Sequence, residues 1–70
     1  MTSECAGKSL WLELLGTQGV VAAATIEREN PLVTAVIVLE GTIVTGDFLC
    51  TRVRVWVNDD GIVTRVPAIG

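Results

Sequence analysis

The stretch that decides the fold runs from residue 41 to residue 54 and has the sequence GTIVTGDFLCTRVR. It joins two apolar runs, 35–39 and 53–57, and each run is typical of a buried strand. Parallel strands need a connection of about a dozen residues, whereas a tight antiparallel hairpin needs only about two to five. The connection here is too long for a tight hairpin and has no helical periodicity. The sequence therefore predicts two parallel strands joined by a wide, extended loop, and such a loop indicates a function.

The two strands differ in their patterns. The first, 34–39, is a continuous run rich in β-branched residues, which predicts a strand that is covered on both faces or lies centrally in a small sheet. The second, 51–57, alternates between valines and a second set of side chains, Arg52, Arg54 and Trp56. Successive side chains of a strand point to opposite faces of the sheet. The valines are therefore expected to face the core, and the two arginines to lie on the opposite face.

A helix is predicted before the strands, from about residue 18 to residue 29. Thr17 is its predicted N-cap, because a threonine hydroxyl can accept a hydrogen bond from an amide of the first turn. The residues spaced to form its buried face are Ala22, Thr25 and Ile26, with Val21 as a further candidate. Asn30-Pro31 ends the helix, since the residue before a proline is pushed out of the α region.

The two ends of the chain are predicted to be irregular or to hold short elements. Residues 1–8 form an irregular arm held by Cys5, and Trp11 in the following turn is a core plug at a chain end. Near the other end, residues 58–61 form a turn that contains the required glycine. A short edge strand over 62–66 is predicted to follow it.

Length, composition and charge fit one small globular domain that spans residues 1–70. Of these 70 residues, 50% are hydrophobic and 19% are charged, which predicts a folded chain with a small core. The net charge of −3 argues against nucleic acid as a partner, because phosphate binding needs a basic stripe. No apolar run reaches the roughly 18 residues of a membrane span. Residues 1–4 also lack the basic-then-apolar layout of a signal peptide.

The two cysteines, Cys5 and Cys50, leave two alternatives open. In a chain without histidine they are too few for a structural zinc site. As a disulfide they would close a loop of about 45 residues, which stabilises a fold by roughly 4 kcal/mol in the chain-entropy model. The other alternative is a pair of buried free thiols.

The inventory of reactive side chains argues against an enzyme. The chain has no histidine to act as a general base, and its only serines, Ser3 and Ser9, lie in the N-terminal region. It also lacks a glycine-rich phosphate loop and the lysine of a P-loop. The two aspartates of the 58–61 turn lack the further ligands of a calcium loop. We therefore expect neither catalysis nor a cofactor or metal.

The two arginines of the second strand suggest a more specific arrangement. Asp47 lies at the apex of the loop, and Arg52 and Arg54 share one strand face two residues apart. From there they can bracket the Asp47 carboxylate and the Thr45 hydroxyl, and charge-assisted hydrogen bonds of this kind hold an extended loop rigid. The alternative is a pair of ordinary surface arginines with little energetic effect. The spacing leaves both interpretations open.

Five motifs along the chain carry a family resemblance. They are WLEL at 11–14, ENP at 29–31, GTIVT at 41–45, RVRVWV at 52–57 and VPAIG at 66–70. Together they cover nearly the whole chain and resemble the potato inhibitor I family of serine protease inhibitors, which includes barley chymotrypsin inhibitor, eglin and the squash-seed inhibitors. The resemblance implies an α+β fold, in which a single helix packs on a small mixed sheet. A long exposed inhibitory loop would lie between two parallel strands, in agreement with the layout predicted from the residues.

The resemblance also implies a reactive site within the loop. The scissile bond would be Gly46-Asp47, with Gly46 in the primary specificity pocket of the protease. The other residues that contact the protease would be Ile43, Val44, Thr45 and Phe48. The residues that support the loop would be Arg52 and Arg54, which reach Thr45 and Asp47, together with the carboxylate of Gly70. Cys5 and Cys50 match the disulfide of the squash-seed members.

Two residues depart from the family pattern. Leu12 stands where the family usually has proline, and Gly46 stands where related inhibitors place methionine, leucine or a basic residue. Trypsin needs a buried lysine or arginine, which Gly46 does not supply. The expected targets are therefore subtilisin-like proteases, which rely on extended backbone pairing, or elastase-type proteases with small primary pockets.

We expect the chain to be a monomer. The resemblance implies a plant seed or defence protein in an extracellular, vacuolar or seed storage compartment, whereas the residues alone leave a cytosolic location open. Two other classes of protein remain as alternatives. One is a non-inhibitory interaction module that kept the fold and lost the activity through Gly46. The other is a purely structural domain.

Overall fold

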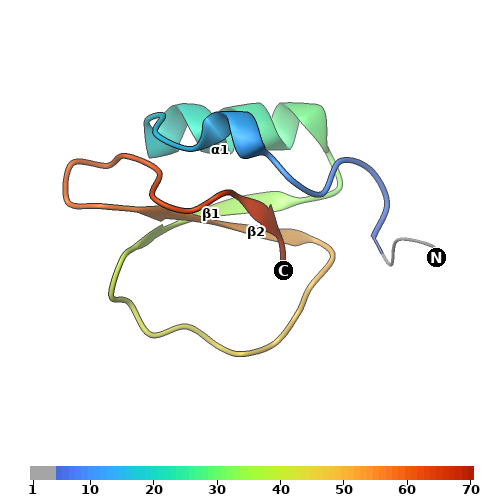
Figure 1. Cartoon of the computed structure of the whole chain (residues 1–70). Coiled ribbons are helices and arrows are strands. Elements are labelled where there is room, and N and C mark those ends of the chain that lie inside the picture. The colour runs from blue at the N-terminus through green and yellow to red at the C-terminus, as the bar shows by residue number, and fades with distance from the viewer. Residues whose placement is uncertain (1–4) are drawn as a thin grey trace.

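The structure, a computed structural model, describes residues 5–70 and places one α-helix against one face of a small sheet (Figure 1). Its elements in chain order are the 3-10 helix η1 (Leu12–Leu14), the α-helix α1 (Gly19–Glu29) and the strands β1 (Thr34–Leu39), β2 (Arg52–Val57) and β3 (Ala68–Ile69). The segment between β1 and β2 arches away from the sheet on the side opposite α1. The predicted α+β fold is therefore confirmed.

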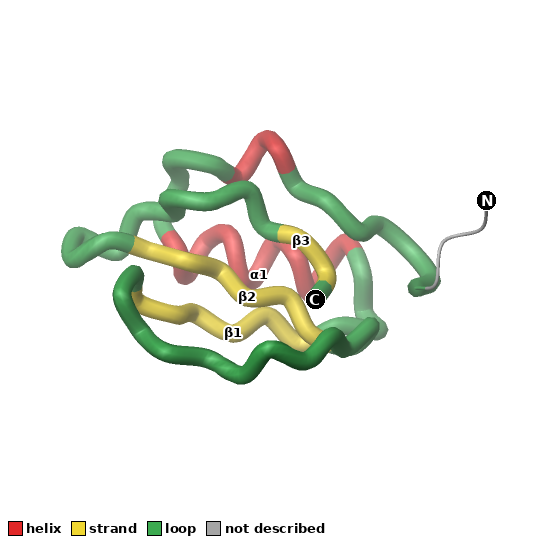
Figure 2. The backbone as a smooth tube through the Cα atoms, turned by 60° about the horizontal axis from the view of Figure 1, so that its bottom comes forward, coloured by secondary structure: helices red, strands yellow, loops and turns green. Residues whose placement is uncertain are grey.

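β2 lies in the middle of a three-stranded sheet of order β1-β2-β3 (Figure 2). β1 and β2 are parallel, in a register that pairs Thr34 with Arg52 and Leu39 with Val57. β2 and β3 are antiparallel. The sheet is thus mixed, and the prediction of two parallel strands joined by an extended loop is confirmed.

The core lies between α1 and the helix-facing side of β2. The three valines of β2 are buried, and they belong to one apolar cluster with Ala22 and Ile26 of α1. Trp11 belongs to the same cluster and is 0% exposed, while its indole N–H donates to Glu29 Oε1 over 2.9 Å. The predicted alternation of β2 and the predicted role of Trp11 as a core plug are both confirmed.

β1 is an edge strand, so the prediction of a strand that is central or covered on both faces is wrong. Val36 and Ile37 are 42% and 43% exposed, and Val38 alone is buried within the strand. The reason is that β3 pairs with the other side of β2 and leaves β1 at the edge. Glu27 of α1 covers part of this edge, because its Oε2 accepts from the Ala35 N–H over 2.9 Å. The β-branched run therefore reflects β propensity more than burial.

The predicted strand over 62–66 is wrong, although the turn over 58–61 that precedes it is correct. The residues directly after the turn form only isolated bridges. Regular pairing with β2 appears only in β3, on the far side of Pro67. The reason is that Ile62 bridges to Gln18 while Val63 bridges to Val57, so the segment does not run along one strand. Pro67, which has no N–H to donate to a ladder, then separates it from β3.

Helix α1 begins without the predicted threonine cap. Gln18 is its N-cap residue and makes no side-chain cap bond, whereas the Thr17 hydroxyl donates to Leu14 O over 2.7 Å. The Gly19 N–H donates instead to Gly61 O over 2.8 Å. The first amide of α1 is therefore satisfied by the backbone of a distant turn and not by a local threonine cap.

Asn30, which is 2% exposed, holds the N-terminal arm against the end of α1. Its Nδ2 donates to Ala6 O over 3.1 Å and to Lys8 O over 2.9 Å. Gly7 between them has a φ of +82°, and a Cβ there would lie 2.7 Å from Asn30 Nδ2, so this position requires glycine. The arm is irregular as predicted in its described part, whereas residues 1–4 lie outside the described residues.

A disulfide joins Cys5 to Cys50, with the two Cα atoms 5.2 Å apart. Of the two alternatives that the sequence leaves open, the disulfide is therefore correct. Cys50 lies at the C-terminal base of the loop between β1 and β2. The bond thus connects the N-terminal arm directly to the loop.

We expect the double substitution Cys5→Ser and Cys50→Ser to lower the free energy of unfolding by about 2–4 kcal/mol, because the cross-link restricts the unfolded chain. The arm contacts of Asn30 remain, so the variant should still fold. Urea denaturation measures the difference. The control Ala6→Ser changes an exposed residue of the same arm and should shift the free energy by less than about 0.5 kcal/mol. A loss below about 1 kcal/mol in the double variant would contradict the prediction.

Candidate functional site

The loop between β1 and β2 is exposed over its central part. Residues 41–49 are all exposed. Its large apolar side chains are Ile43, Val44, Phe48 and Leu49, and Ile43 is 96% exposed. Figure 1 shows the loop standing clear of the sheet, on the side away from α1. Apolar side chains gathered on an exposed segment are typical of a surface that binds a partner.

Arg52 lies beneath the loop and connects it with the C-terminal segment. Its Nη2 donates to the main-chain O of Asp47 over 2.9 Å, and its Nη1 and Nη2 lie 3.5 and 3.4 Å from the two carboxylate oxygens of the same residue. Its Nε donates to Gly70 O over 2.7 Å. The Gly70 N–H donates back to Arg52 O over 2.9 Å. One guanidinium therefore holds the loop and the C-terminal segment together.

Arg54, two residues further along β2, contacts the other neighbour of Gly46. Its Nη2 donates to Thr45 Oγ1 over 2.9 Å and lies 3.7 Å from Asp47 Oδ1. The Thr45 hydroxyl in turn donates a hydrogen bond to Asp47 Oδ1. Both neighbours of Gly46 are thus held from below. Gly46 itself has nothing within 4 Å of the place where a Cβ would stand.

The Asp47 carboxylate is stabilised in its charged form. The hydrogen bond from the Thr45 hydroxyl is the main cause, and Arg52 adds to it, so that the pKa of Asp47 lies below its ordinary value of 3.8. The Asp47 side chain is 50% exposed, whereas those of Arg52 and Arg54 are 16% and 18% exposed. Solvent screens the exposed carboxylate, so these ion pairs add little to the overall stability. Their main effect is on the conformation of the loop.

The structure brings the three residues with assigned loop support, Arg52, Arg54 and Gly70, together with the two loop residues that they were expected to hold. Thr45, Asp47, Arg52, Arg54 and Gly70 form one connected set of hydrogen bonds. Phe48 also lies near this set, because a Cβ on Gly70 would stand 3.8 Å from its ring. Ile43 lies outside the set and stays almost wholly exposed. The loop is therefore held around Gly46, while side chains on both sides of it remain accessible.

Two further residues, Glu40 and Arg65, which carry no expected role from the sequence, meet at the N-terminal base of the loop. Arg65 Nε and Nη2 donate to the two carboxylate oxygens of Glu40 over 2.8 and 2.9 Å. The two residues are 25 positions apart, so no local spacing relates them. The signal in the sequence is only a pair of opposite charges, which many surface residues share.

Within residues 5–70 no helix combines the length and the apolar character needed to cross a membrane. In the same part of the chain, no three acidic, histidine or cysteine side chains are grouped where they could hold a metal ion. In the 58–61 turn, Asn58 Oδ1 accepts from the Asp60 N–H over 3.0 Å, so this turn is closed by its own side chain.

Together these features define a class of protein, in which a small single-helix scaffold presents an exposed loop and holds it from beneath with two arginines. The model of the potato inhibitor I family matches residues 3–70. The chain belongs to this family, whose members are serine protease inhibitors and not enzymes. The resemblance stated from the sequence motifs is therefore confirmed.

Plant proteins are among its relatives. The "Glu S.griseus protease inhibitor" of Momordica charantia is 60% identical over 68 residues, which cover 97% of this chain and 100% of that protein. The "Inhibitor of trypsin and hageman factor" of Cucurbita maxima is 59% identical over 68 residues, again covering 97% and 100%. The crystal structure of bitter gourd trypsin inhibitor has a TM-score of 0.93 at 57% identity and covers 97% of this chain and 100% of that one. These similarities confirm the fold class.

Proposed function

We propose that this chain inhibits serine proteases in a substrate-like manner, and that its loop presents the bond Gly46-Asp47 to the catalytic serine. The observation that carries the proposal is geometric, because Arg54 holds Thr45 on one side of Gly46 and Arg52 holds Asp47 on the other. Membership of an inhibitor family supports the same function. The flanking subsites of the protease would contact Ile43, Val44, Thr45 and Phe48.

The same contacts account for inhibition instead of turnover. An extended loop that is already ordered loses little conformational entropy on binding, so its contacts contribute fully to affinity. When the serine oxygen attacks the Gly46 carbonyl carbon, the C–N bond breaks and the Asp47 nitrogen takes a proton and becomes a free amine. Arg52 holds Asp47 beside the acyl group through the 2.9 Å bond to its main-chain O. The amine therefore attacks the acyl carbon before water can: the peptide bond reforms, the bond to the serine oxygen breaks, and the amine proton returns to that oxygen.

We place subtilisin-like and elastase-type proteases ahead of trypsin as targets. Gly46 brings no side chain to the primary pocket, so affinity must come from backbone pairing and from neighbouring side chains. Ile43, which is 96% exposed, offers the most accessible apolar surface in the loop. In a complex with trypsin, the buried carboxylate of the primary pocket would stay unpaired, which costs about 2–5 kcal/mol of binding free energy. Relatives named for trypsin, and one from Amaranthus caudatus named a trypsin/subtilisin inhibitor, support a serine protease as the partner.

A titration against three enzymes tests this function. We expect tight inhibition of subtilisin, inhibition of pancreatic elastase, and inhibition of trypsin at least about a hundredfold weaker than that of subtilisin. Prolonged incubation with subtilisin should produce one cut, after Gly46, which mass spectrometry locates. Strong inhibition of trypsin alone would overturn the proposed target preference.

The alternative is an interaction module that has kept the fold without inhibiting a protease. Gly46 is the residue that favours it, since the loop lacks a side chain for the primary pocket. Failure to inhibit any of the three enzymes, with the chain folded and its disulfide intact, would favour this alternative over the proposed function.

A further inference from the structure

The N-terminal base of the loop is held by a separate cluster of side chains, centred on the Glu40 carboxylate. Its Oε2 accepts from Thr64 Oγ1 over 2.6 Å and from Arg65 Nε over 2.8 Å, and its Oε1 accepts from Arg65 Nη2 over 2.9 Å. A carboxylate that accepts two parallel hydrogen bonds from one guanidinium forms one of the strong types of ion pair. These donors, Arg65 first and Thr64 second, lower the pKa of Glu40.

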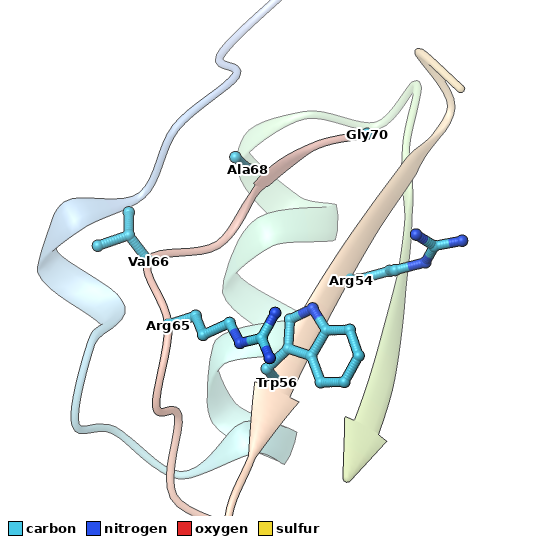
Figure 3. A pocket seen from close by; sticks show the side chains of 6 residues that line it. All are labelled: Arg54, Trp56, Arg65, Val66, Ala68 and Gly70. Atoms are coloured by element: carbon cyan, nitrogen blue, oxygen red, sulfur yellow. The ribbon is translucent and has the colours of Figure 1, made fainter. Parts of the chain in front are cut away.

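Arg65 is fixed in turn by the aromatic ring of Trp56. Its guanidinium carbon lies 4.1 Å from the ring centroid, and Figure 3 shows the group lying over the indole. An arginine that stacks on an aromatic face while pairing with a carboxylate has one favoured position. The Thr64 N–H also donates to the main-chain O of Trp56 over 2.9 Å. The cluster is therefore built on β2, the central strand.

Glu40 stands where the chain leaves β1 and enters the loop. Its N–H donates to Val57 O over 2.8 Å, which continues the pairing with β2 by one residue. The chain then turns, because the Thr42 N–H donates to Leu39 O over 3.0 Å and Gly41 has a φ of +92°. The orientation of this turn sets the direction in which the residues before Gly46 leave the sheet.

We propose that Glu40 and Arg65 are positioning residues of the inhibitory loop. They fix the N-terminal base of the loop independently of the contacts that Arg52 and Arg54 make to Asp47. The inference rests on the proposed function. Arg54 and Trp56 lie on the same face of β2, and both line a hollow of about 230 Å³ together with Arg65 (Figure 3). Arg54 holds Thr45, and Trp56 holds Glu40 through Arg65.

The segment 41–44 is thus fixed at both ends, because Glu40 before it and Thr45 after it are held by arginines. A segment fixed at both ends has fewer conformations to lose when a protease orders it, so its contacts contribute more to affinity. Both side chains of the pair are partly exposed, 55% for Arg65 and 33% for Glu40, so the pair by itself adds little to global stability. We therefore expect the effect of the pair to appear mainly in the loop.

The test compares Glu40→Gln, Arg65→Lys and the double variant with the wild-type chain. Glutamine keeps the shape of Glu40 without its charge, and lysine keeps the charge of Arg65 without the planar fork. Each single change should raise the inhibition constant for subtilisin about three- to tenfold. The double change should raise it no more than the larger single change, because the two residues act as one unit. Amide hydrogen exchange of residues 41–45 should become faster, while the thermal midpoint moves by little.

Arg28→Lys provides the matched control, because Arg28 is exposed on α1, across the sheet from the loop. It should change neither the inhibition constant nor the exchange of residues 41–45. Unchanged inhibition and unchanged exchange in both single variants would overturn the proposal, as would effects that simply add in the double variant. If the wild-type chain inhibits no tested protease, the proposed function fails. Faster exchange in the variants would still support the positioning role in the loop, and unchanged exchange would overturn it.

Discussion

With Arg52 replaced by alanine, we expect subtilisin to cleave the Gly46-Asp47 bond about a hundredfold faster than in the wild-type chain. The substitution removes the 2.9 Å bond to Asp47 O and the 2.7 Å bond to Gly70 O. Each hydrogen bond from a charged group contributes about 1.5–3 kcal/mol, and about 1.4 kcal/mol corresponds to a factor of ten. The Asp47 amine is then no longer held beside the acyl group, so water attacks before the bond reforms. The inhibitor becomes a substrate.

Mass spectrometry of the chain incubated with catalytic amounts of subtilisin measures this cleavage. The disulfide between Cys5 and Cys50 spans the bond, so the cut chain gains the mass of one water and separates only after reduction. Arg28→Ala removes an arginine from the opposite side of the sheet and should leave the chain as resistant as the wild type. Cleavage of the Arg52→Ala variant at the wild-type rate would show that these contacts do not protect the bond.

The parallel strands and the loop are predictable because their signals are long and local. β2 alternates over six residues, which assigns its valines to the core and its arginines to the face beneath the loop. The length of the connection then favours a parallel pair over a tight hairpin. Once the arginines are placed under Thr45 and Asp47, the hydrogen bonds around Gly46 follow from the reach of a guanidinium. The spacing alone still allowed two ordinary surface arginines, and the family resemblance was needed to assign them to loop support and to place the reactive site at Gly46-Asp47.

The errors fall on short elements and on distant partners. β3 has two residues, which is too few for any periodic pattern to show. The edge position of β1 depends on where β3 pairs, so it could not be predicted without β3. The start of α1 is likewise decided by Gly61, far along the chain, and not by the neighbouring Thr17. The pair of Glu40 and Arg65 was missed for the same reason, since only the folded sheet brings it together.

Replacing Gly46 with lysine should convert the chain into a strong trypsin inhibitor, with an inhibition constant at least about a thousandfold lower than that of the wild type. Trypsin recognises a basic side chain through a buried carboxylate in its primary pocket, and lysine supplies the missing partner. The scaffold accepts the change, because nothing lies within 4 Å of a Cβ at Gly46. Gly46 does not have a positive φ, so its backbone conformation suits other residues. A competitive assay with a chromogenic trypsin substrate measures the gain.

Two further variants test whether Gly46-Asp47 is the correct assignment of the scissile bond. Thr42→Lys adds the same charge to the same exposed loop, four residues earlier, and should leave trypsin inhibition weak. Asp47→Lys should also fail, because it places the lysine beyond the scissile bond and removes the carboxylate that Thr45 and Arg52 contact. A gain in Asp47→Lys without one in Gly46→Lys would show that the bond lies one residue later than proposed.

Inhibition of subtilisin should persist in Gly46→Lys, since the contacts that hold Thr45 and Asp47 do not involve the side chain at residue 46. Loss of subtilisin inhibition together with a gain against trypsin would mean that residue 46, and not the supported loop, dominates affinity.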